Sequence, residues 1–372
     1  MVKNKLGNLV NIKTGKLDAN ASSSDGEYPF FTCSREPLKI SSYSYDCKCV
    51  LVAGNGDLNV KYYEGKFDAY QRTYIIESKD ESILDTRYLY LFLSKYVEKL
   101  RELSIGGVIK YIKINNLTDP IIPLPPLKDQ KRIVKILDKA DTLRQKRKQA
   151  VGFLDDYLKS VFLEMFGDPV KNPKNWEKKK LSRIADICSG VTKGRKLDKT
   201  KTVFAPYMRV ANVQDEYIDL TEVKEIEVLP SDIEKYRLQY GDLLLTEGGD
   251  PDKLGRGGVW RGQIENCIHQ NHIFRLRLDK KLATPEYISA LIGSNYGKRY
   301  FLKSAKQTTG IATINSTQLK SFPIVLPTIV LQNKYSKAVK KLEIIKQKML
   351  TQSKALEIQF QALIQKAFKG VL

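Results

Sequence analysis

The sequence predicts a mixed α/β fold of the α+β class, in which two long helices forming an antiparallel coiled coil separate two globular domains. Three observations predict it. The chain repeats itself, the first part of each copy contains short β-rich runs, and the second part is a long heptad pattern. A length of 372 residues is sufficient for two domains of ordinary size. We predict globular domains at residues 1–122 and 168–325 and helical segments at residues 123–167 and 326–372.

The duplication is clearest at a proline-rich step before each helical segment. Residues 122–130 recur at residues 324–332, an offset of 202 residues, and residues 5–15 resemble residues 180–190 at an offset of 175. Matches in the same order along both copies indicate a tandem duplication with pseudo-two-fold symmetry. The residues repeated at the larger offset are Leu124, Pro125, Gln130 and Phe166, which match Leu326, Pro327, Gln332 and Phe368.

The first part of each copy is typical of a mixed sheet domain. Residues 49–53 and 73–76 are β-rich runs bounded by glycine-containing turns. The second part lacks glycine and proline over residues 128–148 and 331–368, and its apolar residues alternate in steps of three and four. This spacing predicts a coiled-coil seam. The predicted seam residues are Ile133, Ile136, Ala140, Leu143, Leu154, Leu342, Ile345, Met349, Leu356 and Leu363.

The direction of the two helices follows from the chain order. The first helix enters the second domain and the second helix leaves it, and the ends of a domain usually lie close together. We therefore expect the helices to be antiparallel rods of about 38 residues, roughly 57 Å long at about 1.5 Å per residue. The alternative is two unrelated amphipathic helices, each docked on its own domain.

Composition restricts the class of protein. The net charge is +21, from 63 Lys and Arg against 42 Asp and Glu, and predicts a polyanionic partner, of which nucleic acid is the first candidate. The five cysteines are an odd number at irregular spacing, which favours reduced thiols in a cytoplasmic protein. The apolar runs are too short for a membrane span, so we expect no membrane partner.

The sequence offers little that predicts catalysis. It contains neither an Asn-Pro-Pro-aromatic string nor a phosphate-binding G-x-x-x-x-G-K-[ST] loop. Asp232, Glu234 and Lys235 resemble a nuclease string, but such strings are common by chance and Pro230 favours a loop or a helix start. Cys267, His269 and His272 lack a fourth ligand at zinc-site spacing. We predict no catalytic residue and no metal site.

Taken together, these motifs resemble the specificity subunits of type I restriction–modification systems. The resemblance rests on the duplicated proline-rich step, the long helix after each copy, and the Lys-Leu-x5-Ile-x2-Gly motif that begins at Lys5 and Lys180. Residues 247–257 followed by residues 267–274 look like one recurrent type of target-recognition domain. The second proline-rich step departs from the family pattern, because residues 328–331 read Thr-Ile-Val-Leu where Pro-Leu-x-x is expected. This departure predicts a changed contact with a partner subunit.

The resemblance implies a non-catalytic DNA reader with two target-recognition domains, each reading half of a bipartite sequence, and with the helices as a spacer. It also implies double-stranded DNA as a partner, together with two methyltransferase subunits that modify adenine N6 and restriction subunits that translocate DNA. S-adenosylmethionine, ATP and Mg²⁺ would then belong to the partner subunits, and this chain would bind no cofactor.

We divide the candidate DNA contacts into those to phosphates and those to bases. Each charged candidate has an alternative as a solvated surface charge, and each polar one as an internal hydrogen-bonding group. The phosphate candidates are Lys61, Lys66, Arg72, Lys110, Lys193, Lys253, Arg256, Arg261 and Lys306, and the base-reading candidates are Gln71, Gln270, Asn271 and His272.

Two alternative functions stay open from the sequence. The first is a scaffold protein whose coiled coil recruits a partner and whose globular domains bind something other than DNA. The second, less favoured, is a methyltransferase or nuclease that acts alone.

Overall fold

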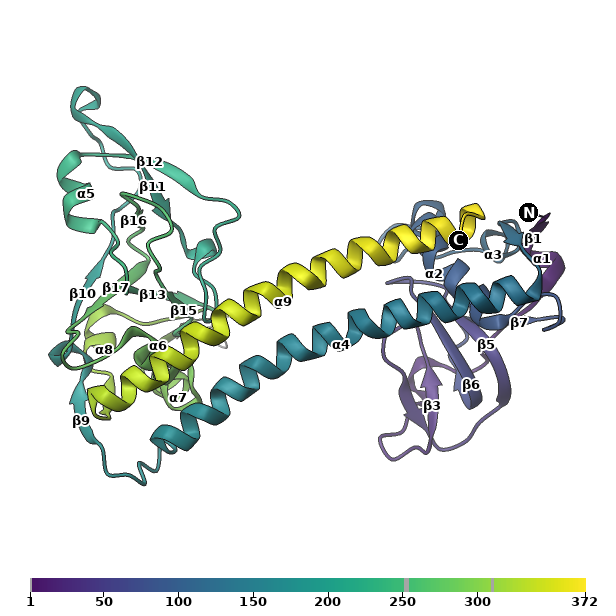
Figure 1. The fold of residues 1–372 in the computed structure, drawn as a ribbon, viewed down its shortest axis with the longest axis horizontal. Helices are drawn as coiled ribbons and strands as arrows, with labels where there is room; N and C mark the ends of the chain where they lie inside the picture. The colour runs from purple at the N-terminus through teal and green to yellow at the C-terminus, as the bar shows by residue number, and fades with distance from the viewer. Residues whose placement is uncertain (1, 251–253, 309–310) are drawn as a thin grey trace. The chain divides into compact units, whose positions relative to one another are not determined.

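The computed structural model describes residues 2–250, 254–308 and 311–372. The chain forms two compact units. Unit 1 contains Met1–Ala150 and Met349–Leu372, and unit 2 contains Val151–Lys348. Each unit therefore combines one globular domain with a part of each long helix (Figure 1).

Unit 1 is built around a six-stranded sheet in the order β2-β7-β5-β6-β3-β4, in which only β3 and β6 are parallel. Helix α2 packs on β5 and β6, and β1 pairs with β8 beside the start of α4. The elements of this domain are β1 (Val2–Lys5), α1 (Leu6–Leu9), β2 (Val10–Thr14), β3 (Tyr28–Phe31), β4 (Leu38–Ile40), β5 (Tyr45–Ala53), β6 (Val60–Ala69), β7 (Thr73–Ser78), α2 (Thr86–Leu103), α3 (Asn115–Thr118) and β8 (Ile121–Leu124).

Unit 2 divides the corresponding strands among smaller sheets, in the orders β10-β17-β13-β15, β12-β11-β16, β14-β19-β18 and β20-β9. Its elements are β9 (Glu177–Lys180), β10 (Ala185–Ser189), β11 (Val203–Met208), β12 (Lys224–Val228), α5 (Pro230–Tyr236), β13 (Leu243–Thr246), β14 (Gly248–Gly249), β15 (Gly257–Val259), β16 (Ile268–His269), β17 (Ile273–Leu278), α6 (Pro285–Gly293), α7 (Asn295–Ser304), β18 (Lys306–Thr308), β19 (Ile311–Thr313), α8 (Ser316–Lys320) and β20 (Pro323–Leu326).

The proline-rich step joins each domain to its helix through a buried glutamine. Gln130 is fully buried, accepts a hydrogen bond from the Asp85 amide at 3.0 Å and donates to the carbonyls of Ile83 and Pro125. Since a buried amide without partners would be costly, these three bonds fix the angle at which α4 leaves the domain.

Gln332 repeats this arrangement in unit 2. It is fully buried, accepts from the Thr284 amide at 3.0 Å and donates to the carbonyls of Leu282 and Pro327. The sequence repeat is thus also a repeat of hydrogen bonds.

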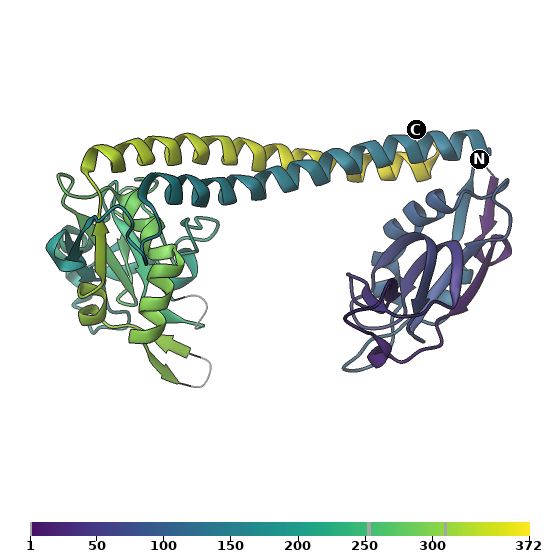
Figure 2. The same ribbon diagram turned by 90° about the horizontal axis from the view of Figure 1, so that it is seen from below.

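The long helices α4 (Leu127–Phe166) and α9 (Ile329–Lys369) are antiparallel within each unit. In unit 1 the first half of α4 lies beside the last part of α9 (Figure 2). Arg144 of α4 pairs there with Glu357 of α9 at 2.8 Å. In unit 2 the late residues of α4 meet the early residues of α9, as in the pair of Asp155 and Lys346 at 2.6 Å. Each helix therefore begins on one domain and ends on the other.

Two buried phenylalanines anchor the helix ends. Phe166, at the end of α4, packs against Tyr287 and Tyr335 of unit 2. Phe368, near the end of α9, packs against Tyr88 and Phe92 of unit 1. Phe166 and Phe368 are equivalent in the repeat. In each unit the ring at the end of one long helix therefore packs against a buried tyrosine of the globular domain.

The predicted seam residues differ in exposure. Ile136, Leu143 and Ile345 are 37%, 51% and 37% exposed, whereas Leu137 is fully buried. The less exposed positions of α4 run 133, 137, 140 and 144, and those of α9 include 342, 346 and 349. The other predicted members, which are buried or half-buried, are Ile133, Ala140, Leu154, Leu342, Met349, Leu356 and Leu363.

Polar residues occupy some of the less exposed positions of both helices. Arg144 occupies the seam because its guanidinium lies 4.4 Å from the centre of the Phe360 ring and pairs with Glu357. Lys346 occupies the equivalent place in unit 2 through its pair with Asp155. An apolar heptad count passes over such residues and selects the apolar neighbour instead.

Over the residues with described structure, no helix is long and apolar enough to cross a membrane.

Candidate nucleic-acid interface

In the first domain, a short exposed turn follows β6 and contains Tyr70, Gln71 and Arg72. The Tyr70 amide donates to the Phe31 carbonyl at 2.9 Å, and the Gln71 amide donates to the Leu17 carbonyl at 2.9 Å. Two neighbouring segments thus hold the turn while its side chains are left at the surface.

The second domain holds the turn of Gln270, Asn271 and His272 in the same way. The Gln270 amide donates to the Met208 carbonyl at 3.0 Å, and the Asn271 amide donates to the Val191 carbonyl at 3.0 Å. Gln270 therefore corresponds to Tyr70, Asn271 to Gln71, and His272 to Arg72. We call these two triplets the reading turns.

A glycine supports each reading turn from behind. A Cβ atom on Gly15 would lie 2.1 Å from the Ala69 carbonyl oxygen, and one on Gly190 would lie 1.9 Å from the His269 carbonyl oxygen. Only glycine permits such a close backbone approach. This accounts for the glycine of the repeated Lys-Leu-x5-Ile-x2-Gly motif.

A backbone bridge connects the first reading turn to a hairpin. The Gly54 amide donates to the Arg72 carbonyl at 2.7 Å, and the Ile112 amide donates to the Gly54 carbonyl at 2.9 Å. The Gly56 amide donates to the carbonyl of Lys110, which is exposed on the hairpin closed by residues 105 and 111. Arg72 and Lys110 thus lie on one continuous surface.

The second domain repeats this bridge with different residues. The Glu247 amide donates to the His272 carbonyl at 3.0 Å, and the Ile314 amide donates to the Glu247 carbonyl at 2.9 Å. Strand β14 then pairs with β19, whose partner β18 begins with the exposed Lys306.

The side chains of the reading turns differ in how they are held. Nε2 of Gln71 donates to the Asp18 carboxylate at 2.9 Å, and Nδ1 of His272 lies 2.8 Å from the Glu247 carboxylate. Gln270 and Asn271 are half-buried, and their side chains form no hydrogen bond within the described part of the chain. Their amide groups are therefore available to a ligand.

His269, next to the second reading turn, has a structural role. It is fully buried, and Nδ1 lies 3.2 Å from the Tyr236 carbonyl. Burial lowers the pKa of His269 to about 4, so the ring is neutral at pH 7. The turn thus rests on an uncharged ring, while the first domain has Ala69 at this position.

The predicted phosphate contacts of the first domain differ in exposure. Lys66 is exposed and its ammonium lies 4.6 Å from the centre of the Tyr43 ring. Lys61 is half-buried, its ammonium donates to Asn59, and burial lowers its pKa. Arg72 is exposed beside the reading turn.

Two predicted contacts in the second domain need correction. Arg261 is only 20% exposed and pairs with Glu286 at 2.6 Å and Glu343 at 2.8 Å. It therefore joins its domain to α9 and is not free to bind phosphate. Arg256 donates to the Gln214 side chain and the Val210 carbonyl, both at 3.3 Å, so it braces a loop from within. Lys253 lies outside the described residues.

Sequence reasoning missed several residues of this surface. Tyr70 and Glu247 acquire their positions only through the backbone bonds described above, so no local signal identifies them. The exposed Lys196, Lys199 and Lys201 could have been found, because residues 193–201 contain five basic residues. Within the described residues, no group of three or more His, Cys, Asp and Glu side chains is placed to hold a metal ion.

Comparison with known proteins relates this architecture to a family. Residues 1–151 and 173–357 match the type I restriction modification DNA specificity domain. The chain is 44% identical over 134 residues to the type I restriction enzyme EcoDI specificity subunit of Escherichia coli, covering 36% of this chain and 30% of that protein. It is 26% identical over 296 residues to the EcoKI specificity subunit of E. coli K12, covering 75% and 63%.

A solved structure has a fold similar to that of this chain. The S subunit of a type I restriction–modification system from M. genitalium superposes with a TM-score of 0.62 at 16% identity, covering 99% of this chain and 96% of that one. The chain spans about a third to two thirds of the length of the curated relatives named above. Because the family match covers most of the chain and both of its domains, this protein belongs to the type I restriction–modification DNA specificity family.

Proposed function

We propose that this chain is the sequence-specific DNA-binding subunit of a type I restriction–modification complex and that it reads a bipartite target, one half with each domain. The observation that carries the proposal is the pair of reading turns. One set of backbone bonds presents Tyr-Gln-Arg in the first domain and Gln-Asn-His in the second. A constant frame with different exposed side chains suits two readers of different half-sites.

Hydrogen-bonding chemistry assigns roles within each turn. Gln71, Gln270 and Asn271 carry the amide groups that pair with the adenine edge in the major groove, and His272 offers one ring nitrogen besides the one near Glu247. The proposed phosphate contacts, which fix the register of the protein on the duplex, are Lys61, Lys66, Arg72, Lys110, Lys193 and Lys306.

The paired helices act as the spacer between the half-sites in this proposal. Arg144–Glu357 and Asp155–Lys346 are ion pairs in which the residue numbers add to the same total, so both fix one antiparallel register. A charged residue at a seam position specifies register in this way. The spacer length would then be a property of the helix pair and not of either domain.

Catalysis belongs to partner subunits in this proposal. Two methyltransferase subunits would methylate adenine N6 with S-adenosylmethionine, and restriction subunits would use ATP and Mg²⁺, all in the cytoplasm. This chain would bind no cofactor and contribute no catalytic residue, which agrees with the naming of its relatives as specificity subunits.

The test is sequencing for N6-methyladenine in cells that express the methyltransferase with and without this chain. We expect a bipartite motif that disappears when the chain is absent. Exchanging residues 1–122 for those of a relative should change one half of the motif and leave the other half intact. Methylation that is unchanged without the chain would reject the proposal, and a change in both halves would reject the modular reading.

The alternative is a scaffold whose domains bind something other than DNA. It predicts that the purified chain binds no duplex at low salt, whereas the DNA-reader proposal predicts binding that weakens steeply as salt rises.

A further inference from the structure

The positive charge of the chain is unevenly distributed between its two domains. Residues 1–122 contain 17 Lys and Arg against 15 Asp and Glu, whereas residues 168–325 contain 27 against 19. The first domain is nearly neutral, so the excess resides in the second domain and the helices. Phosphate attraction is the main source of sequence-independent DNA affinity. The two domains are therefore not equal partners in that attraction.

The contrast is sharpest in the segment that leaves each reading turn. Leu17 and Val191 accept equivalent hydrogen bonds from the turns, and the chain then runs to β3 in the first domain and to β11 in the second. Residues 18–27 contain three acidic residues and no basic one. Residues 192–202, which we call the basic arm, contain five basic residues and one acidic residue.

Internal contacts hold the basic arm in place. Arg195 pairs with Asp232 at 2.5 Å, and the Thr202 hydroxyl donates to Glu227 on β12 at 2.6 Å. The Asp198 carboxylate accepts hydrogen bonds from the amide and hydroxyl of Thr200. The arm is therefore held to α5 at Arg195 and to β12 at Thr202, and Asp198 and Thr200 brace it locally.

Three lysines of the arm stay outside the ion pairs of the described residues. Lys193, Lys196 and Lys199 are exposed and form no ion pair with any described residue, while Lys201 lies 3.5 Å from Asp198. Their charges are thus free for a ligand. The arm begins beside the second reading turn. The Val191 carbonyl accepts a hydrogen bond from the Asn271 amide, and Lys193 is only two residues further along the chain.

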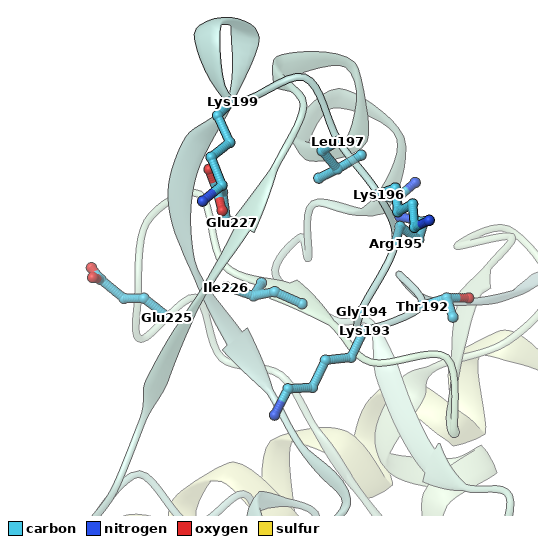
Figure 3. A pocket seen from close by; sticks show the side chains of 10 residues that line it. All are labelled: Thr192, Lys193, Gly194, Arg195, Lys196, Leu197, Lys199, Glu225, Ile226 and Glu227. Carbon is cyan, nitrogen blue, oxygen red and sulfur yellow. The ribbon is translucent and has the colours of Figure 1, made fainter.

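A groove of about 500 Å³ separates the arm from β12. Its lining includes Glu225 and Glu227 of β12, and Figure 3 shows that Lys193 and Lys196 of the arm point in different directions. Carboxylates in the lining disfavour an anion within the groove. The exposed lysine side chains at the rim are therefore a better place for a phosphate than the groove itself.

We propose that the basic arm is the main phosphate clamp of the two globular domains, and that the second domain supplies more of the non-specific attraction to duplex DNA than the first. The first domain instead places Asp18 beside Gln71, where a carboxylate repels phosphate. This inference rests on the proposed function and extends it, because it gives the two domains different tasks: the second holds the backbone, and the first contributes discrimination with little attraction of its own.

The test measures the salt dependence of binding of the full-length chain to a fluorescently labelled duplex of random sequence. The triple variant K193Q/K196Q/K199Q should lower the slope of log K against log salt by about 2 to 3, since each lost phosphate contact removes about 0.9. K193R/K196R/K199R should keep the parental slope, because it retains the charges.

The matched control is K280Q/K281Q/K320Q in the same domain. These lysines are also exposed and without ion pairs to described residues, and Lys280 and Lys281 follow the end of β17 that is far from the reading turn. The control has the same net charge as the arm variant. The inference is overturned if both variants lower the slope equally or if the arm variant leaves it unchanged. Absence of duplex binding by the parent chain would instead reject the proposed function itself.

Discussion

The two recognition domains share their buried frame and differ in almost everything they expose. Both hold a reading turn with the same amide-to-carbonyl bonds, both support it with a glycine, and both join their helix through a buried glutamine. The turn side chains and the charge of the following segment differ. The duplicated scaffold thus keeps the interactions that fix the backbone, while the side chains at its surface differ between the two copies.

A second difference lies where each domain meets its helix. Arg87 on α2 pairs with Asp138 on α4 at 2.9 Å, whereas the equivalent positions in unit 2 are Glu286 on α6 and Lys340 on α9, 3.5 Å apart. The ion pair is retained with its polarity reversed. Glu286 also pairs with Arg261 and is 1% exposed, while Asp138 is 36% exposed. The two junctions should therefore respond unequally to mutation.

The largest expected effect tests the equivalence of the helix anchors. Phe166→Ala and Phe368→Ala should each lower the free energy of unfolding of their own unit by about 3–5 kcal/mol, because each removes a buried ring. Hydrogen exchange resolved by peptide would assign the loss to unit 2 for Phe166 and to unit 1 for Phe368. Phe153→Ala is the control, since that ring is 68% exposed. A loss spread equally over both units would contradict the contacts described.

The charge-reversed junctions give the next effect. Glu286→Ala should destabilise unit 2 by about 2–3 kcal/mol, because it removes the buried one of the two carboxylates that pair with Arg261 and leaves only the more exposed Glu343. Asp138→Ala should cost unit 1 only about 1 kcal/mol, since the pair is partly exposed. Hydrogen exchange resolved by peptide would measure the loss in each unit, and tryptophan fluorescence during denaturation would report unit 2 alone, because Trp176 and Trp260 both lie in it. Equal losses at the two junctions would refute the asymmetry.

Glu286 should also make unit 2 sensitive to acid. Burial alone would raise its pKa, but the hydrogen bond and charge of Arg261 outweigh burial and lower the pKa of Glu286 overall. A lowered carboxyl pKa gives stability that is present above the unfolded value near 4.3 and is lost as pH falls through the folded value. The Glu286→Ala variant should lack that part of the acid dependence.

His269 should add an earlier acid transition in the same unit. Its pKa falls from the ordinary value near 6.5 to about 4, so the unfolded chain binds a proton first. Stability is complete above about pH 6.5 and decreases by up to about 3 kcal/mol as pH falls toward 4. Urea denaturation followed by tryptophan fluorescence between pH 7 and pH 4 would measure this loss. Unit 1 contains no histidine, so its stability should stay nearly constant in this range, and a parallel loss there would contradict the assignment.

The smallest expected effect is on the affinity for DNA of variants in the two reading turns. If the proposed function holds, Gln71→Ala and Asn271→Ala should each weaken binding to the cognate duplex by about 1–3 kcal/mol without lowering stability, because each would remove a proposed base-edge contact. Competition with duplexes altered in one half-site would show which half each variant no longer discriminates. Both substitutions affecting the same half-site would refute the correspondence of the two turns.

Much of the architecture could be predicted from the sequence because it depends on local and repeated patterns. The tandem repeat, the two long helices and their antiparallel direction follow from residue spacing and chain order, which survive divergence between the copies. The buried glutamines were visible as part of the repeated step. The helical conformation of the segments that follow the proline-rich steps could be predicted from their own residues alone.

Tertiary structure alone decided which side chains serve which purpose. The seam position of Arg144 depends on Phe360 and Glu357 of the other helix, and the fate of Arg261 depends on Glu286 and Glu343 from two other elements. A charged side chain binds whichever carboxylate or phosphate the fold brings within a few ångströms, and residue order does not encode that distance. The sequence by itself therefore determined a duplicated, helix-linked pair of domains, while only the fold decided which of their basic residues form internal ion pairs and which stay exposed.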